Sequence, residues 1–97
     1  MNNKITHEEA AEIFAELGHS IRLQIIKCSV KYGKEGILVG KIQENLNIPA
    51  STLSHHIKRL IKVGLIKQNR SRQMLYCVIN QDKLRLLAKH IQLDYLS

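Results

Sequence analysis

The sequence lacks the segments that mark membrane, secreted and disulfide-rich proteins. It has no apolar run near the roughly 18 residues that cross a bilayer, and its first residues are polar and acidic, unlike a signal peptide. We therefore expect a cytoplasmic protein that has no membrane partner. Two cysteines in 97 residues are too few for a disulfide scaffold, so a reducing compartment would keep both as thiols.

The signs of an enzyme are also missing. There is no Gly-rich phosphate loop, no pair of acids beside the imidazoles and no nucleophile motif. We therefore expect no catalytic residues, no cofactor and no enzymatic activity.

Acidic residues are absent from one long segment of the chain. No Asp or Glu occurs from Asn45 through Gln81, although six Lys and Arg residues do, and four of the eight acids lie within the first sixteen residues. The formal net charge is +7. A basic chain with so long an acid-free segment favours a polyanionic partner, and nucleic acid is the first candidate.

The stretch from Ile48 to Gly64 has the pattern of an amphipathic helix, predicted over residues 50–63. Its apolar residues follow the spacing of one helical stripe, and the opposite face combines small hydroxyls, an imidazole and cations. Such a face suits the DNA major groove, where hydroxyls and imidazoles reach base edges while Lys and Arg meet phosphates. An ordinary surface helix with a solvated basic face is the alternative. The exposed face is made of Ser51, Ser54, His55, Lys58, Arg59 and Lys62.

Three further helices are expected before this one. Thr6 and Glu9 form a capping box that opens a helix ending near Gly18. Ser20 is expected to cap a second helix of residues 21–32, and a third, short helix covers residues 39–46. Two helices joined by three or four residues, the second with a polar exposed face, are typical of a helix-turn-helix.

The apolar period changes to two after Gly64. This predicts strands over residues 65–69 and 73–79 around a polar tip at residues 70–72, the β-hairpin that forms a wing over residues 65–79. Asn80 is expected to cap a last helix of residues 81–95. The fold class is mainly α with a small β-hairpin, a winged helix-turn-helix in the order α-α-α-α-β-β-α. We expect one DNA-binding domain over residues 1–97.

The last helix carries an apolar stripe with heptad-like spacing. So small a domain has little remaining core to cover this stripe, which predicts that a partner helix does so. The first helix supplies the natural partners, so the terminal helices are expected to form a homodimer interface. The residues assigned to this interface are Ile13, Phe14, Leu84, Leu87 and Ile91.

Three stretches together resemble the ArsR-type winged-helix regulators of bacteria. Residues 17–26 are similar to that family's "L-x-x-x-x-R-L-x-I-L" opening. Residues 53–66, from Leu53-Ser54-His55-His56-Ile57 to Gly64-Leu65-Ile66, are similar to "V-S-H-H-L-x-x-L-x-x-x-G-L-V". Residues 72–76 resemble the wing motif "G-R-x-x-x-Y". The resemblance spans roughly residues 14–80 in one order without large gaps.

The resemblance implies a dimeric repressor on a palindromic, double-stranded DNA operator, with the first and last helices forming most of the dimer interface. It places Ser51, Ser54 and His55 at base-reading positions. The wing residues would lie near the minor groove and the flanking phosphates. The full set of expected DNA contacts is Ser51, Thr52, Ser54, His55, Lys58, Arg59, Lys62, Arg70, Arg72 and Gln73.

The chain departs from the family pattern at four positions. Pro49 and Ala50 replace a capping Ser and a Gln that often touches DNA, so the operator sequence cannot be carried over. Leu38 stands where the third helix usually has a polar cap. Ser71 stands where the wing tip usually has Gly.

The metal sites of the family are also missing. The start of the third helix has no Cys-x-Cys pair, and Asp82 in the last helix lacks the accompanying His. His90 and Asp94 are four residues apart and could share an ion, but two ligands fall short of a four-coordinate site. We therefore expect no metal and leave the inducer unknown.

Two alternatives remain. Cys28 and Cys77 could serve a thiol-based sensor of oxidants or reactive sulfur, although buried structural thiols are the commoner state of such residues. The winged helix could instead bind a protein, which should require an exposed apolar patch that the sequence does not indicate.

Overall fold

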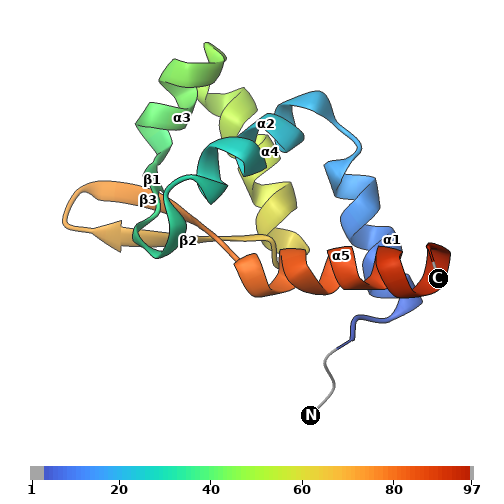
Figure 1. The fold of residues 1–97 in the computed structure, drawn as a ribbon. Helices are drawn as coiled ribbons and strands as arrows, with labels where there is room; N and C mark the ends of the chain where they lie inside the picture. Colours follow the sequence, from blue (N-terminus) through green and yellow to red (C-terminus); the bar gives the residue numbers. More distant parts are fainter. Residues whose placement is uncertain (1–3, 97) are drawn as a thin grey trace.

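The computed structural model describes residues 4–96, with three strands and five α-helices along the chain (Figure 1). In this part of the chain, no helix has the length and apolar character needed to cross a membrane. The elements are α1 (His7–Leu17), α2 (Ser20–Val30), a 3₁₀ turn η1 (Gly33–Glu35), β1 (Ile37–Leu38), α3 (Val39–Leu46), α4 (Ala50–Lys62), β2 (Ile66–Ser71), β3 (Met74–Ile79) and α5 (Gln81–Tyr95).

The predicted caps of the first and last helices are confirmed. The Thr6 hydroxyl accepts from the Glu9 amide while the Glu9 carboxylate accepts from the Thr6 amide, and the Asn80 side chain accepts from the Lys83 amide. The cap predicted for the second helix is wrong. His19, in extended conformation, caps α2, because its Nδ1 accepts from the Ile21 amide at 3.2 Å.

The helix-turn-helix has the predicted layout. α3 covers the expected residues and ends at Leu46, and the following residue, Asn47, turns the chain with a left-handed φ of 52°. α4 begins only three residues later and ends at Lys62, one residue before the predicted end. α2 also ends earlier than predicted, at Val30.

The sheet has three strands in the order β1-β3-β2, where the sequence predicted only a hairpin. β1 pairs Ile37 with Cys77 and Leu38 with Tyr76. The backbone at Gly36 lies close to β3. A Cβ at this position would lie 2.9 Å from the carbonyl oxygen of Cys77, and the φ of Gly36 is +83°. Only glycine fits both conditions, so it allows this long-range pairing.

The wing covers almost the predicted residues, but its first strand extends further and its turn lies elsewhere. β2 continues to Ser71, which pairs with Met74, so the turn consists of Arg72 and Gln73 and not of residues 70–72. Arg72 has a φ of 59°, a conformation that is uncommon for an arginine and was not predicted.

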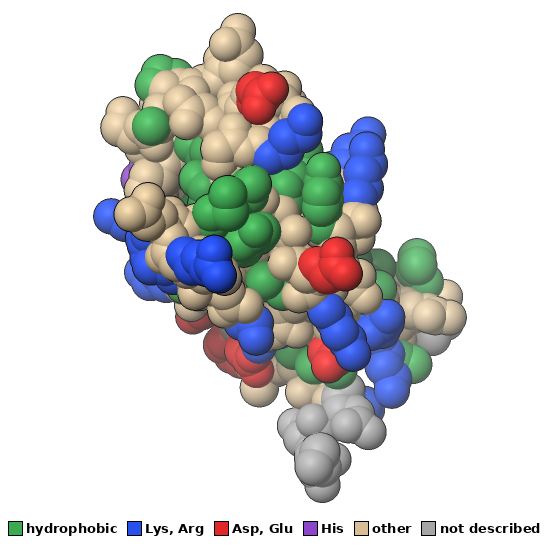
Figure 2. Space-filling view, turned by 90° about the vertical axis from the view of Figure 1, so that its left-hand side faces the viewer, with side chains coloured by type: hydrophobic (Ala, Val, Ile, Leu, Met, Phe, Trp, Pro, Cys, Tyr) green, Lys and Arg blue, Asp and Glu red, His purple; other side chains and the backbone are tan. Residues whose placement is uncertain are grey.

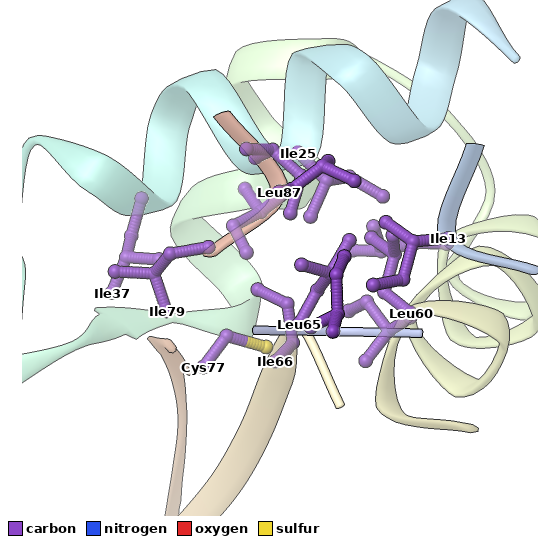
Figure 3. Close-up of a cluster of buried hydrophobic side chains, with 14 of the residues drawn as sticks. Ile13, Ile25, Ile37, Leu60, Leu65, Ile66, Cys77, Ile79 and Leu87 are labelled. Carbon is purple, nitrogen blue, oxygen red and sulfur yellow. The ribbon is translucent and has the colours of Figure 1, made fainter. Parts of the chain in front are cut away.

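Every layer of the molecule contributes to one hydrophobic core (Figure 3). The burial of two core residues corrects the predicted dimer interface. Ile13 of α1 and Leu87 of α5 are only 2% and 6% exposed within a single chain. They stabilise the monomer fold and are removed from the proposed dimer interface. α1 and α5 nevertheless lie on the same side of the molecule, far from the wing tip (Figure 1).

Candidate nucleic-acid interface

α4 is divided into a buried face and an exposed polar face. Leu53, Ile57 and Leu60 are at most 1% exposed and fasten the helix to the core. Ser54 and His55 point outward from its first two turns. Of the remaining predicted contacts on this helix, Ser51 and Lys58 are exposed and Thr52 is half-buried.

The beginning of α4 is open to a ligand. Among the described residues, no side chain caps this helix, because Pro49 occupies the N-cap position. Its first amide groups therefore add a partial positive charge beside Ser51 and Ser54. Hydroxyls, an imidazole and a helix N-terminus together can bind base edges and phosphate oxygens.

Arg59 forms an ion pair with another residue of the same chain. Its Nε lies 2.9 Å from Oε1 of Glu16, a residue of α1 that is only 8% exposed. The hydrogen bond from Arg59 holds the pKa of the Glu16 carboxyl below its usual value, and the same bond raises the pKa of Arg59. The predicted phosphate contact of Arg59 therefore competes with an ion pair between α1 and α4.

The surroundings of Lys62 also differ from those expected for a phosphate contact. It lines a shallow depression together with Glu9, Glu12 and Lys83. These acids belong to α1, so the acid-free segment of the sequence has acidic neighbours in space. Lys58, one turn earlier on the exposed face of α4, is the better-placed phosphate contact.

The wing carries most of the remaining cations. All β2 residues after Ile66 are exposed, as are Arg72 and Gln73 in the turn. Figure 2 shows the end of the molecule from which the hairpin projects, where many Lys and Arg side chains lie at the surface together with several acidic ones. Arg70, Arg72 and Gln73 can therefore reach a polyanion that α4 contacts.

The outer face of the wing is more apolar than the sequence indicated. The strand pairing places Leu38, Tyr76 and Met74 on this face. Met74 is 53% exposed, and the Tyr76 hydroxyl lies 3.6 Å from its sulfur. Figure 2 shows hydrophobic side chains exposed at this end of the molecule. The predicted absence of an exposed apolar patch is therefore wrong.

The two adjacent histidines of α4 lie on different faces of the helix, as the angle of about 100° between neighbouring helical residues requires. His55 is exposed, whereas His56 is 6% exposed and its Nδ1 lies 3.2 Å from Nη1 of Arg22. The sequence reading did not single out Arg22 or Glu16. One signal was available for Glu16, because it lies three residues after Ile13 on the buried stripe of α1.

The cysteines are placed unfavourably for a thiol switch. Cys77 is fully buried in β3, and this burial raises the pKa of its thiol, although the Gln68 amide lies 4.0 Å from its sulfur. A raised pKa lowers the thiolate fraction and hence the reactivity. Cys28 is half-buried at the edge of the core, and both residues are free thiols.

No three-ligand metal cluster occurs among residues 4–96. His90 and Asp94 do meet on α5, with 3.5 Å between Nδ1 and Oδ2. The two side chains are one turn apart on the same helix, and this contact between them accounts for their spacing without an ion.

Comparison with known proteins agrees with this geometry. A family described as a helix-turn-helix domain matches residues 5–69. An uncharacterized HTH-type transcriptional regulator of Methanocaldococcus jannaschii is 34% identical over 86% of this chain and 91% of its own length. The transcriptional repressor PagR of Bacillus anthracis is 29% identical over 84% of this chain and 80% of its own length.

Solved structures share the fold. The crystal structure of PagR matches with a TM-score of 0.69 and 28% identity, covering 90% of this chain and 94% of that one. A homodimeric winged helix-turn-helix DNA-binding domain from Mycobacterium bovis, a possible ArsR-family regulator, matches with a TM-score of 0.71 and 22% identity. The alignment covers 91% of this chain and 86% of that one. The expected winged helix-turn-helix fold is confirmed.

Proposed function

This chain belongs to the helix-turn-helix family of DNA-binding transcriptional regulators and has the ArsR-type winged-helix fold, and from this we propose that it is a cytoplasmic, homodimeric repressor of a palindromic operator. The observation that carries the proposal is the exposed face of α4. That face offers Ser54 and His55 beside an uncapped helix N-terminus, and it belongs to a molecule whose wing is basic.

In this proposal the helix and the wing perform different tasks. Ser54 and His55 enter the major groove and hydrogen-bond to base edges, which discriminates sequence. Lys58 and the wing arginines Arg70 and Arg72 bind phosphates or the minor groove, which positions the protein without reading sequence directly. Burial of Leu53, Ile57 and Leu60 holds α4 rigidly on the core, so its polar face is presented in one orientation.

The proposed dimer uses what remains exposed on the terminal helices. Phe14 of α1 is 39% exposed, and Leu84 and Ile91 of α5 are half-buried. PagR, a repressor, supports the repressor assignment, and the homodimeric M. bovis domain supports the assembly. Two linked copies would place two recognition helices in successive turns of the major groove.

Replacing Ser54 and His55 separately by alanine tests base readout. Each variant is expected to lose about 1–3 kcal/mol of binding free energy on the operator and much less on random duplex, because a bond to a base edge is lost. Affinities for both duplexes are measured by fluorescence anisotropy. Lys58→Ala is the control, and it should weaken both complexes about equally. Equal losses on both duplexes for Ser54→Ala and His55→Ala would contradict base readout.

Replacing Arg70 and Arg72 together by alanine tests the wing. The double variant is expected to bind all duplexes more weakly and to reduce the slope of log affinity against log salt by up to about 2, because two phosphate contacts release fewer counterions. An unchanged slope would show that the wing leaves the phosphates untouched. Met74→Ala is the companion variant, and it should leave the salt slope unchanged, because methionine carries no charge to neutralise a phosphate.

A further inference from the structure

A polar cluster lies where α1, α2 and α4 meet, behind the recognition helix. Arg22 is its centre, since its Nε donates to the main-chain oxygen of Glu16 and its Nη1 lies 3.2 Å from Nδ1 of His56. The Glu16 carboxylate lies 3.8 Å from Arg22 and 2.9 Å from Arg59. The side chains of Arg22 and Glu16 are only 11% and 10% exposed. Three helices are thus held together by groups largely withdrawn from water.

Two imidazoles in this cluster act as hydrogen-bond acceptors. A guanidinium can only donate, so His56 must accept through Nδ1 and is neutral in this arrangement. His19 accepts through its own Nδ1 from the Ile21 amide, and this bond caps α2. The two rings are 4.5 Å apart between centroids. A protonated imidazole has no acceptor nitrogen, so neither contact survives protonation.

We propose that His19, Arg22 and His56 form a positioning junction that holds α4 in its DNA-binding orientation only while both imidazoles are neutral, so that operator binding weakens as the pH falls below neutrality. This inference rests on the proposed DNA-binding function. A proton on His56 would set a cation against Arg22. A proton on His19 would remove the α2 cap and add charge at the positive end of that helix.

The charges facing His56 favour its neutral form. Burial, followed by the positive charges that His19, Arg22 and His55 can carry, lowers the pKa of His56 from its usual 6.5. Glu16 is the neighbouring acid, and it is already bonded to Arg59 and Arg22. Because the folded pKa lies below the unfolded one, the stabilisation is complete above pH 6.5 and is lost as the pH falls from there towards the folded value.

The test compares operator affinity at pH 7.5 and pH 5.5 at constant ionic strength, using a duplex selected by the wild-type protein. The variant is His19→Asn combined with His56→Asn, because an asparagine oxygen still accepts a hydrogen bond and does not titrate. Asparagine is also a favoured N-cap residue. His7→Asn is the matched control, since His7 is exposed on α1, away from the junction.

Wild type and His7→Asn are expected to lose about tenfold in affinity at the lower pH, which corresponds to about 1.4 kcal/mol of binding free energy, and the double variant is expected to change little. If the double variant does not bind at pH 7.5, the two single variants test the proposal instead. The operator affinity of each should then depend less on pH than that of the wild type. The proposal is overturned by equal wild-type affinities at both pH values, by an undiminished pH dependence in the variants, or by loss of the helical circular dichroism signal at pH 5.5. Wild type that binds no duplex at pH 7.5 would instead contradict the proposed function itself.

Discussion

Replacing Phe14 and Ile91 together by glutamate is expected to yield a monomer that binds the operator about 10²-fold more weakly or worse. The change places acids on the exposed parts of α1 and α5, where a two-fold axis would bring identical charges together. A monomer loses the high effective concentration that the first bound half-site provides for the second. Phe14 is 39% exposed and Ile91 half-buried, so the chain can tolerate the change better than a core substitution.

Sedimentation and operator titration measure the two expected effects. Val30→Glu is the matched control, because Val30 is 37% exposed at the end of α2, beyond the terminal helices. The control should remain a dimer and bind normally. A Phe14→Glu/Ile91→Glu protein that stays dimeric would refute the interface. Deleting α5 would be a poorer test, since it also removes Leu87 from the core.

Leu60→Ala is expected to destabilise the fold by about 2–5 kcal/mol, a large part of the roughly 5–15 kcal/mol that holds a small domain together. Leu60 is 0% exposed on the inner face of α4, so truncation leaves a cavity beneath the recognition helix. The neighbouring Ile61 is 37% exposed and supplies the control. Ile61→Ala should cost less than about 1 kcal/mol, because little buried contact is lost.

Urea unfolding followed by circular dichroism measures both changes. The midpoint should fall strongly for Leu60→Ala and slightly for Ile61→Ala, with unchanged slopes. Equal losses for the two variants would contradict the division of α4 into a buried and an exposed face. A reduced slope for either variant would show instead that the unfolded or native state had changed in compactness.

Local interactions made much of this architecture predictable. The capping box at Thr6 and Glu9 and the cap at Asn80 involve residues three apart, and the bounds of α3 follow from the flanking turn residues. The recognition helix was equally clear, since its apolar stripe repeats at the helical period. Each of these features depends on neighbours along the chain, which a single sequence displays.

Features that depend on distant residues were missed. β1 is two residues long, and it exists because it pairs with β3 nearly forty positions later. The pattern on α5 showed an apolar stripe, but a stripe cannot say which chain covers its residues, and Leu87 is covered by its own chain.

The candidate site shows the same limit. The outward positions of Ser54 and His55 followed from helical geometry. The hydrogen bond from Arg59 to Glu16 joins residues 43 positions apart, and the sequence around either residue does not predict the other as its partner. The position of the wing turn was also missed, because Arg72 adopts a positive φ that local preferences assign to glycine or asparagine.

Selection of bound duplexes from a random pool tests the central claim most directly. The full chain is incubated with the pool at neutral pH and moderate salt, and the retained sequences are read over successive rounds. A homodimer that reads bases through α4 should enrich one inverted repeat whose half-site centres lie about 10 base pairs, or a multiple of this, apart. Retention of duplexes without any enriched sequence, or of a single half-site, would contradict a dimeric, sequence-reading repressor.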